Sequence, residues 1–130
     1  MRKERGMFHI LLLRLVLGVI FGYHSIPKLT KGKEMASGMN MPFAFVVILG
    51  IAELLAAVGS ILGIYTKYAA IIMGIVMIGA LFYKIVKWKI PFAGMDKTGW
   101  EFDALILAAA IVLFYSGAGP VSLDAKLFGL

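Results

Sequence analysis

The chain contains four apolar runs, each about long enough to cross a lipid bilayer as a single helix. They cover about residues 7–26, 42–64, 68–86 and 100–116. A helix rises about 1.5 Å per residue, so about 20 residues span the roughly 30 Å hydrocarbon core of a bilayer. Hydrophobic residues make up 62% of the sequence and charged residues only 15%, whereas a soluble domain carries about a quarter charged residues. The four runs therefore predict an all-α, integral membrane four-helix bundle.

The spacing of the runs predicts one transmembrane domain over residues 1–130. The second and third runs are separated only by Tyr65, Thr66 and Lys67, so these two helices must form a tight antiparallel hairpin. Both termini and this turn then lie at one end of the bundle, and the longer connections, residues 28–41 and 87–99, lie at the other. We expect a multi-pass protein of the cell membrane that contacts the lipid bilayer.

Composition excludes several classes of function. The chain has no cysteine, which rules out thiolate catalysis, disulfide exchange and Cys-ligated clusters. His9 and His24 lie on one predicted helix, about 22 Å apart, which is too far to ligate one haem iron. The net charge of +6 forms no basic tract, so anionic lipid headgroups are expected as partners rather than nucleic acid. We expect no metal site, no catalytic residue and no intrinsic cofactor.

Glu53 is the most informative residue because it lies near the middle of the second run, close to the bilayer midplane. An exposed charge there costs at least about 2.5 kcal/mol, so the carboxylate must be paired, protonated or in contact with water. Arg14 has a similar expected depth in the first run, within roughly 5 Å. We predict an intramembrane ion pair between Arg14 and Glu53. The pair either lines a polar cavity or acts as a structural clamp that fixes helix register.

A second polar cluster is expected at the end that carries the longer connections. His24 and Lys28 close the first run, and Trp100, Glu101 and Asp103 open the fourth. We regard these five residues, with Arg14 and Glu53, as candidate ligand-binding or cavity-lining residues. His24 could donate a hydrogen bond to a quinone carbonyl or pass protons. The alternatives are simple helix end-capping by the acidic residues and an ordinary interfacial belt of aromatic residues.

The unusual residues of the chain occur in a recognisable order. They are Leu13-Arg14-Leu15, Gly18, Phe21, His24, Lys28 and Leu29, then Gly50-Ile51-Ala52-Glu53-Leu54, then Trp100-Glu101-Phe102-Asp103, and finally Gly117-Ala118-Gly119-Pro120-Val121-Ser122-Leu123-Asp124. This order resembles the DoxX family across essentially the whole chain. The chain departs from the family at Ser25, where the family usually has Gly, and at Ala56-Ala57, which replace a glycine-rich step.

The resemblance implies a four-helix membrane protein of a family named for a small subunit of an archaeal terminal quinol oxidase. Relatives of that family include thiosulfate:quinone oxidoreductase subunits. The resemblance also implies that Arg14, His24, Glu53 and Glu101 line a polar interior. A fold transfers between relatives better than a reaction does, so whether the chain is an enzyme stays open.

Three functions remain. The leading hypothesis is an accessory or quinone-interacting subunit of a membrane redox complex, with redox-complex subunits as partners, because this chain lacks the residues to carry electrons alone. The second is a small proton-coupled transporter that uses Glu53, although a carboxylate neutralised by arginine attracts cations poorly. The third is a structural membrane module without a ligand. A bundle this small is also a candidate for a homo-oligomer.

Overall fold

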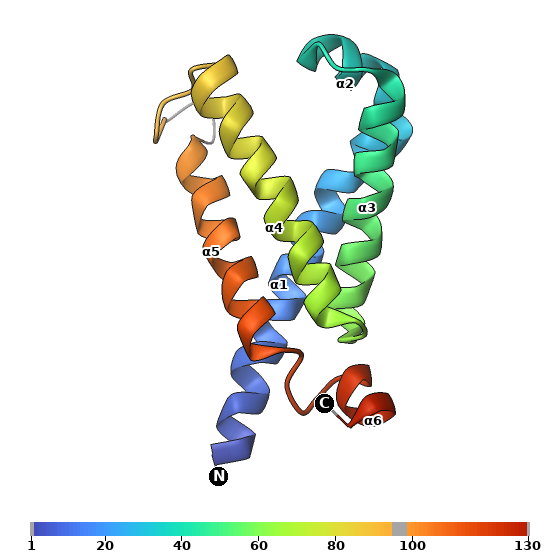
Figure 1. Cartoon of the computed structure of the whole chain (residues 1–130), viewed down its shortest axis with the longest axis vertical. Helices are drawn as coiled ribbons and strands as arrows, with labels where there is room; N and C mark the ends of the chain where they lie inside the picture. The colour runs from blue at the N-terminus through green and yellow to red at the C-terminus, as the bar shows by residue number, and fades with distance from the viewer. Residues whose placement is uncertain (1, 95–98, 130) are drawn as a thin grey trace.

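The computed structural model describes residues 2–94 and 99–129, with side chains from residue 8 onward. Its long helices are α1 (Arg2–Thr30), α3 (Phe43–Leu62), α4 (Thr66–Phe82) and α5 (Trp100–Ser116) (Figure 1). The shorter elements are α2 (Gly32–Met39), the π-helical turn η1 (Tyr83–Lys87) and α6 (Leu123–Phe128). Over the described ranges there is no strand, so the prediction of an all-α bundle is confirmed.

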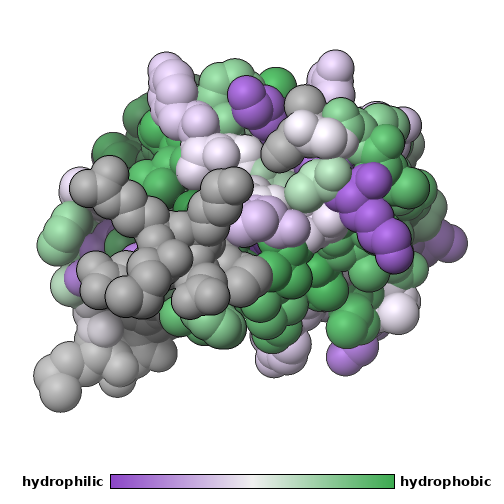
Figure 2. Space-filling model, turned by 90° about the horizontal axis from the view of Figure 1, so that it is seen from below, coloured by the Kyte–Doolittle hydropathy of each residue, from purple (hydrophilic) through white to green (hydrophobic). Residues whose placement is uncertain are grey.

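Three segments of the described chain are long and apolar enough to cross a membrane, namely Phe8–Thr30, Phe43–Leu62 and Thr66–Lys87. Helix α5 has 17 residues, at the lower end of the range of about 17–25 for spanning helices. Large hydrophobic side chains face outward on all four long helices; Val19, Ile48, Ile75 and Leu105 are 64–68% exposed. Seen from the end that carries the termini, polar residues are interspersed with hydrophobic ones, at the outline as well as near the centre (Figure 2). The chain is a membrane protein whose sides contact lipid.

The long helices form two antiparallel pairs. Helix α1 packs along α3, and α4 packs along α5, while a tight turn joins α3 to α4. The two pairs lie close together at the end that carries the termini and diverge toward the end that carries α2 (Figure 1). The core between them consists largely of small and flexible side chains, such as Ala57, Ala69, Ala70 and Met73. This arrangement leaves the α2 end of the bundle wider than the other end.

Helix α1 is longer than the apolar run that predicted it. It has 29 residues and continues through Pro27 to Thr30. Proline has no amide hydrogen and so interrupts one helical hydrogen bond. Its own carbonyl nevertheless accepts a hydrogen bond from the amide of Lys31, at 2.7 Å, so the backbone keeps its helical course past this point. Residues of α1 and α3 therefore lie at the same depth in different combinations from those that the apolar runs predicted.

Two glycines set the register of α1 against α3. A Cβ atom on Gly18 would lie 3.0 Å from the carbonyl oxygen of Ala57, and one on Gly50 would lie 2.8 Å from the Cβ atom of Lys28. Small residues allow such close approach between helices in lipid, where no hydrophobic force drives association. Gly18 and Gly50 therefore serve helix packing. Gly18 lies opposite Ala57, and Lys28 lies opposite Gly50.

The segment that follows α5 returns to the turn between α3 and α4. The buried carboxylate of Asp124 accepts hydrogen bonds from the backbone amides of Tyr65, at 2.7 Å, and Thr66, at 2.9 Å. The amide of Asp124 donates to the carbonyl oxygen of Gly63, at 2.8 Å. A carboxylate at a helix N-terminus satisfies amides that lack helical partners. The C-terminal segment thus caps α4 and closes this end of the bundle.

Gly63 is expected to be the least replaceable residue of this turn. Its φ is +69°, and an added Cβ atom would collide with the guanidinium of Arg14 and with Ser122. The left-handed conformation alone costs an L-residue about 1–2 kcal/mol. Gly63→Ala should therefore lower the melting temperature in detergent clearly more than Gly129→Ala, whose glycine has φ of +71° but no neighbour within 4 Å. Equal effects of the two substitutions would show that crowding at Gly63 is unimportant.

Candidate functional site

A cavity of about 570 Å³ lies between the two helix pairs, at the end where they diverge. Its volume falls in the range of about 300–1,000 Å³ that is typical of small-molecule sites. Its apolar walls include Phe21 of α1, Leu49 of α3, Ile75 of α4 and Ile106 of α5. The polar groups that line it are His24, Lys28, Glu53, Tyr83, Lys84 and Asp103. Both helix pairs contribute to the site, so their divergence creates it.

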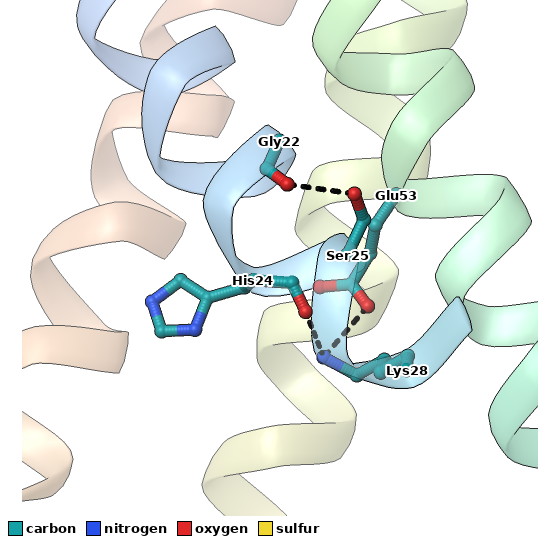
Figure 3. Close-up of polar contacts among 5 residues, drawn as sticks. All are labelled: Gly22, His24, Ser25, Lys28 and Glu53. Carbon is teal, nitrogen blue, oxygen red and sulfur yellow. Dashed lines mark hydrogen bonds and ion pairs between the residues drawn. The ribbon is translucent and has the colours of Figure 1, made fainter. Parts of the chain in front are cut away.

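Glu53 is paired with Lys28 of α1 on one side of the cavity. The Lys28 Nζ atom lies 2.9 Å from Glu53 Oε2, and the two side chains are 12% and 2% exposed. The same Nζ atom donates to the carbonyl oxygen of His24, at 3.1 Å, while Ser25 donates to the carbonyl oxygen of Gly22, at 2.7 Å (Figure 3). Lys28 is the donor beside Oε2, an oxygen that has two lone pairs. This oxygen retains capacity for a further donor.

The predicted ion pair between Arg14 and Glu53 is wrong. Arg14 is buried beside the C-terminal end of α3. Its Nη2 atom donates to the carbonyl oxygen of Val121, and its backbone carbonyl accepts a hydrogen bond from the Ser60 hydroxyl, at 2.8 Å. The buried charge of Asp124 attracts the guanidinium. The prediction failed because α1 extends beyond its apolar run at both ends, which puts Lys28 and not Arg14 beside Glu53.

A second ion pair lies on the opposite side of the cavity, within the other helix pair. The Lys84 Nζ atom lies 2.6 Å from Asp103 Oδ2, and Asp103 is 5% exposed. Lys84 belongs to η1, and π-helical turns occur frequently at functional sites. Asp103 Oδ2, like the Glu53 oxygen, has a lysine ammonium beside it and a second lone pair for a further donor. Two carboxylates therefore face the cavity, each beside a lysine.

His24 lies at the seam between the helix pairs. Its imidazole points away from the Lys28–Glu53 pair (Figure 3). The ring centroid is 6.5 Å from that of Phe102 on α5, and the side chain is exposed although it lines the cavity. A ring in this position can present its nitrogen atoms to a ligand in the cavity, as either a hydrogen-bond donor or an acceptor.

The structure brings four of the seven candidate residues together. His24, Lys28, Glu53 and Asp103 line the cavity. Among the residues that the structure describes, the other three do not line it: Arg14 is in the cluster around Asp124, Glu101 is exposed, and Trp100 packs edge-on against Phe92 at 4.6 Å between centroids. Of the four residues that the family resemblance places in a polar interior, His24 and Glu53 line the cavity, whereas Arg14 and Glu101 do not.

Three cavity residues that carry an N–H or O–H group were not among the sequence-based candidates. Lys84, Tyr83 and Trp88 all lie at or just beyond the end of α4, where lysine and aromatic residues commonly mark the membrane interface. The useful signal was antiparallel pairing of the last two long helices, because it brings the end of α4 beside the start of α5. That pairing predicts a cation at the end of α4 as the partner of Asp103.

A double-mutant cycle should locate the partner of Glu53. Glu53→Gln leaves Lys28 without its countercharge, and Lys28→Met leaves the carboxylate unpaired, so each should lower the unfolding temperature in detergent. The double substitution should be less harmful than the sum, with a coupling energy of about 0.5–3 kcal/mol. Arg14→Met combined with Glu53→Gln should show additive effects. Coupling of Glu53 to Arg14 and not to Lys28 would contradict this assignment.

Comparison with known proteins places the chain. The family model described as DoxX matches residues 9–88. The chain is 30% identical over 122 residues to the protein named "Putative oxidoreductase CatD" of Bacillus subtilis (strain 168), with 91% of this chain and 86% of that protein covered. It is 28% identical over 130 residues to an uncharacterized protein of Haemophilus influenzae, with 98% and 96% covered. No solved structure matches. The chain belongs to the DoxX family.

Proposed function

We propose that this protein is a quinone-interacting accessory subunit of a membrane redox complex, and that the quinone headgroup binds beside His24. The observation that carries the proposal is the cavity, which has apolar walls within the membrane and polar side chains gathered at one end. Small-molecule sites typically combine such walls with a few placed polar groups. A quinone has the same division, with a polar ring and an apolar chain.

The polar end of the cavity suits a ring with carbonyl oxygens. His24 and Tyr83 each carry a group that can donate a hydrogen bond to a carbonyl. Trp88 and Phe102, which also line the cavity, provide aromatic faces for the ring. A bound quinone would supply the capacity to carry electrons and protons. The chain itself would hold the ring, orient it and limit its contact with water.

The electron donor or acceptor must come from a partner. The chain has no cysteine, and both of its histidines lie along α1, so it cannot hold an iron–sulfur cluster or a bis-histidine haem alone. The name of the Bacillus subtilis relative supports a redox setting. We place the protein in the cell membrane, where the outward-facing apolar sides of its helices can contact redox-complex subunits or a second copy of the chain.

The pairing of Glu53 argues against the rival hypothesis of a proton-coupled cation transporter. Such a transporter needs a carboxylate that is free to exchange a proton for a cation. Here Lys28 lies 2.9 Å from Glu53 and already neutralises it. A purely structural role fits the cluster around Arg14 and Asp124, but it gives no reason for a cavity between the helix pairs.

Fluorescence quenching tests quinone binding directly. The chain has two tryptophans, of which Trp88 lines the cavity, so a Trp100→Phe background leaves a single reporter beside the proposed ring. Titration of the purified protein in nanodiscs with ubiquinone or menaquinone should give saturable quenching. His24→Leu in that background should weaken binding about tenfold, the equivalent of one lost hydrogen bond.

The matched control is His9→Leu, because His9 is exposed on the same helix far from the cavity. This substitution should leave the titration unchanged. Quenching that never saturates, or that responds equally to both histidine substitutions, would refute quinone binding at this site.

A further inference from the structure

Two strongly exposed side chains, one on α3 and one on α4, line the cavity. Phe45 of α3 and Ile75 of α4 both line it, and they are 47% and 64% exposed. A side chain that lines a cavity and is also this exposed lies at the rim. Helices α3 and α4 meet at their turn and diverge toward the α2 end (Figure 1), and both belong to membrane-spanning segments. The rim therefore lies on the side of the bundle that faces acyl chains.

Gly79 leaves this rim open on the side of α4. It follows Ile75 by four residues, so both lie on the same helix face. It lines the cavity, and an added Cβ atom would meet no heavy atom within 4 Å. By contrast, a Cβ atom on Gly18 or Gly50 would press against the neighbouring helix. No neighbouring helix therefore requires a glycine at position 79, and its missing side chain leaves space beside the cavity.

The cavity is too small to enclose a whole long-chain quinone. A volume of about 570 Å³ can enclose a quinone ring and the first part of its chain, because sites of this size suit drug-sized ligands. A long isoprenoid chain needs more room than that. Tyr83 lies toward the α2 end, and Ile75 lies eight residues, about two helical turns, deeper in the membrane, so the chain of a quinone held beside Tyr83 would point toward apolar walls and then to lipid.

We propose that the opening bounded by Phe45, Ile75 and Gly79 is a lateral portal through which the isoprenoid chain of a bound quinone extends into the bilayer. This inference rests on the proposed function and specifies the substrate class. The ligand is a long-chain quinone that arrives from the lipid, and the site does not depend on access from water. Because the rim is apolar, the isoprenoid chain passes from lipid into the site without exposing apolar surface to water.

A bulky residue at Gly79 tests the portal. Gly79→Phe should fill the opening and weaken binding of a long-chain quinone about tenfold or more, while a chain-free quinone with the same headgroup binds as it does to the unsubstituted protein. The matched control is Gly38→Phe. Gly38 is an exposed helical glycine that also has no neighbour within 4 Å and lies on α2. This control should bind both quinones normally.

The outcomes separate the two proposals. Normal binding of both quinones by Gly79→Phe, or equal weakening of both, overturns the portal and leaves quinone binding intact. Failure of the long-chain quinone to bind the unsubstituted protein overturns the proposed function, and the portal with it.

Cysteine labelling gives a second measurement that does not depend on a bulky side chain. Because the chain has no cysteine, Gly79→Cys introduces a single thiol at the rim. A long-chain quinone should slow its reaction with a membrane-permeant maleimide, whereas the chain-free quinone should protect it less. Gly38→Cys should react at the same rate with or without either quinone. Equal protection of Gly79→Cys by both quinones would place the chain elsewhere and overturn the portal.

Discussion

The structure depends on neutralising charge inside the membrane between helices that are already packed together. Lys28 of α1 pairs with Glu53 of α3, and Lys84 of η1 pairs with Asp103 of α5. Each of the two ion pairs in the described chain therefore lies within its own helix pair, and neither joins one helix pair to the other. Each helix pair is fixed as a unit while the seam stays free of ionic ties at the α2 end. The cavity occupies that seam. Because the ion pairs are confined to the two helix pairs, they leave room for a cavity between them.

The opposite end of the bundle is closed by a different set of contacts. Arg14 of α1, the turn at Gly63 and the amides that begin α4 all bind residues of the C-terminal segment, chiefly Val121 and Asp124. These contacts tie α1, α3 and α4 together at the point where the two helix pairs converge. A fold closed at one end and divided at the other can hold a ligand without losing the packing that defines it, because the two tasks use different residues.

Hydropathy predicted the fold, but it could not predict the register. An apolar run shows how many residues contact lipid and does not show where the helix begins, so α1 was assigned about 20 residues in place of 29. That error put Arg14 beside Glu53. The register depends on close contacts at Gly18 and Gly50, which appear only when both helices are in place. Asp103 was recognised as a candidate, but its partner Lys84 lies beyond the third run, where lysine is also common for simple interfacial reasons.

The charge state of the site bears on what it can accept. Each carboxylate that faces the cavity has a lysine within 3 Å, so the site as a whole presents no large uncompensated charge. A neutral headgroup with hydrogen-bond acceptors loses little by entering such a site, whereas a free ion would have to break an existing pair or remain unpaired in a medium where that is costly. The same residues that hold each helix pair together therefore favour an uncharged ligand. Since an uncharged ligand with an apolar chain resides in the bilayer, the ion pairs and the lipid-facing opening select for the same class of molecule.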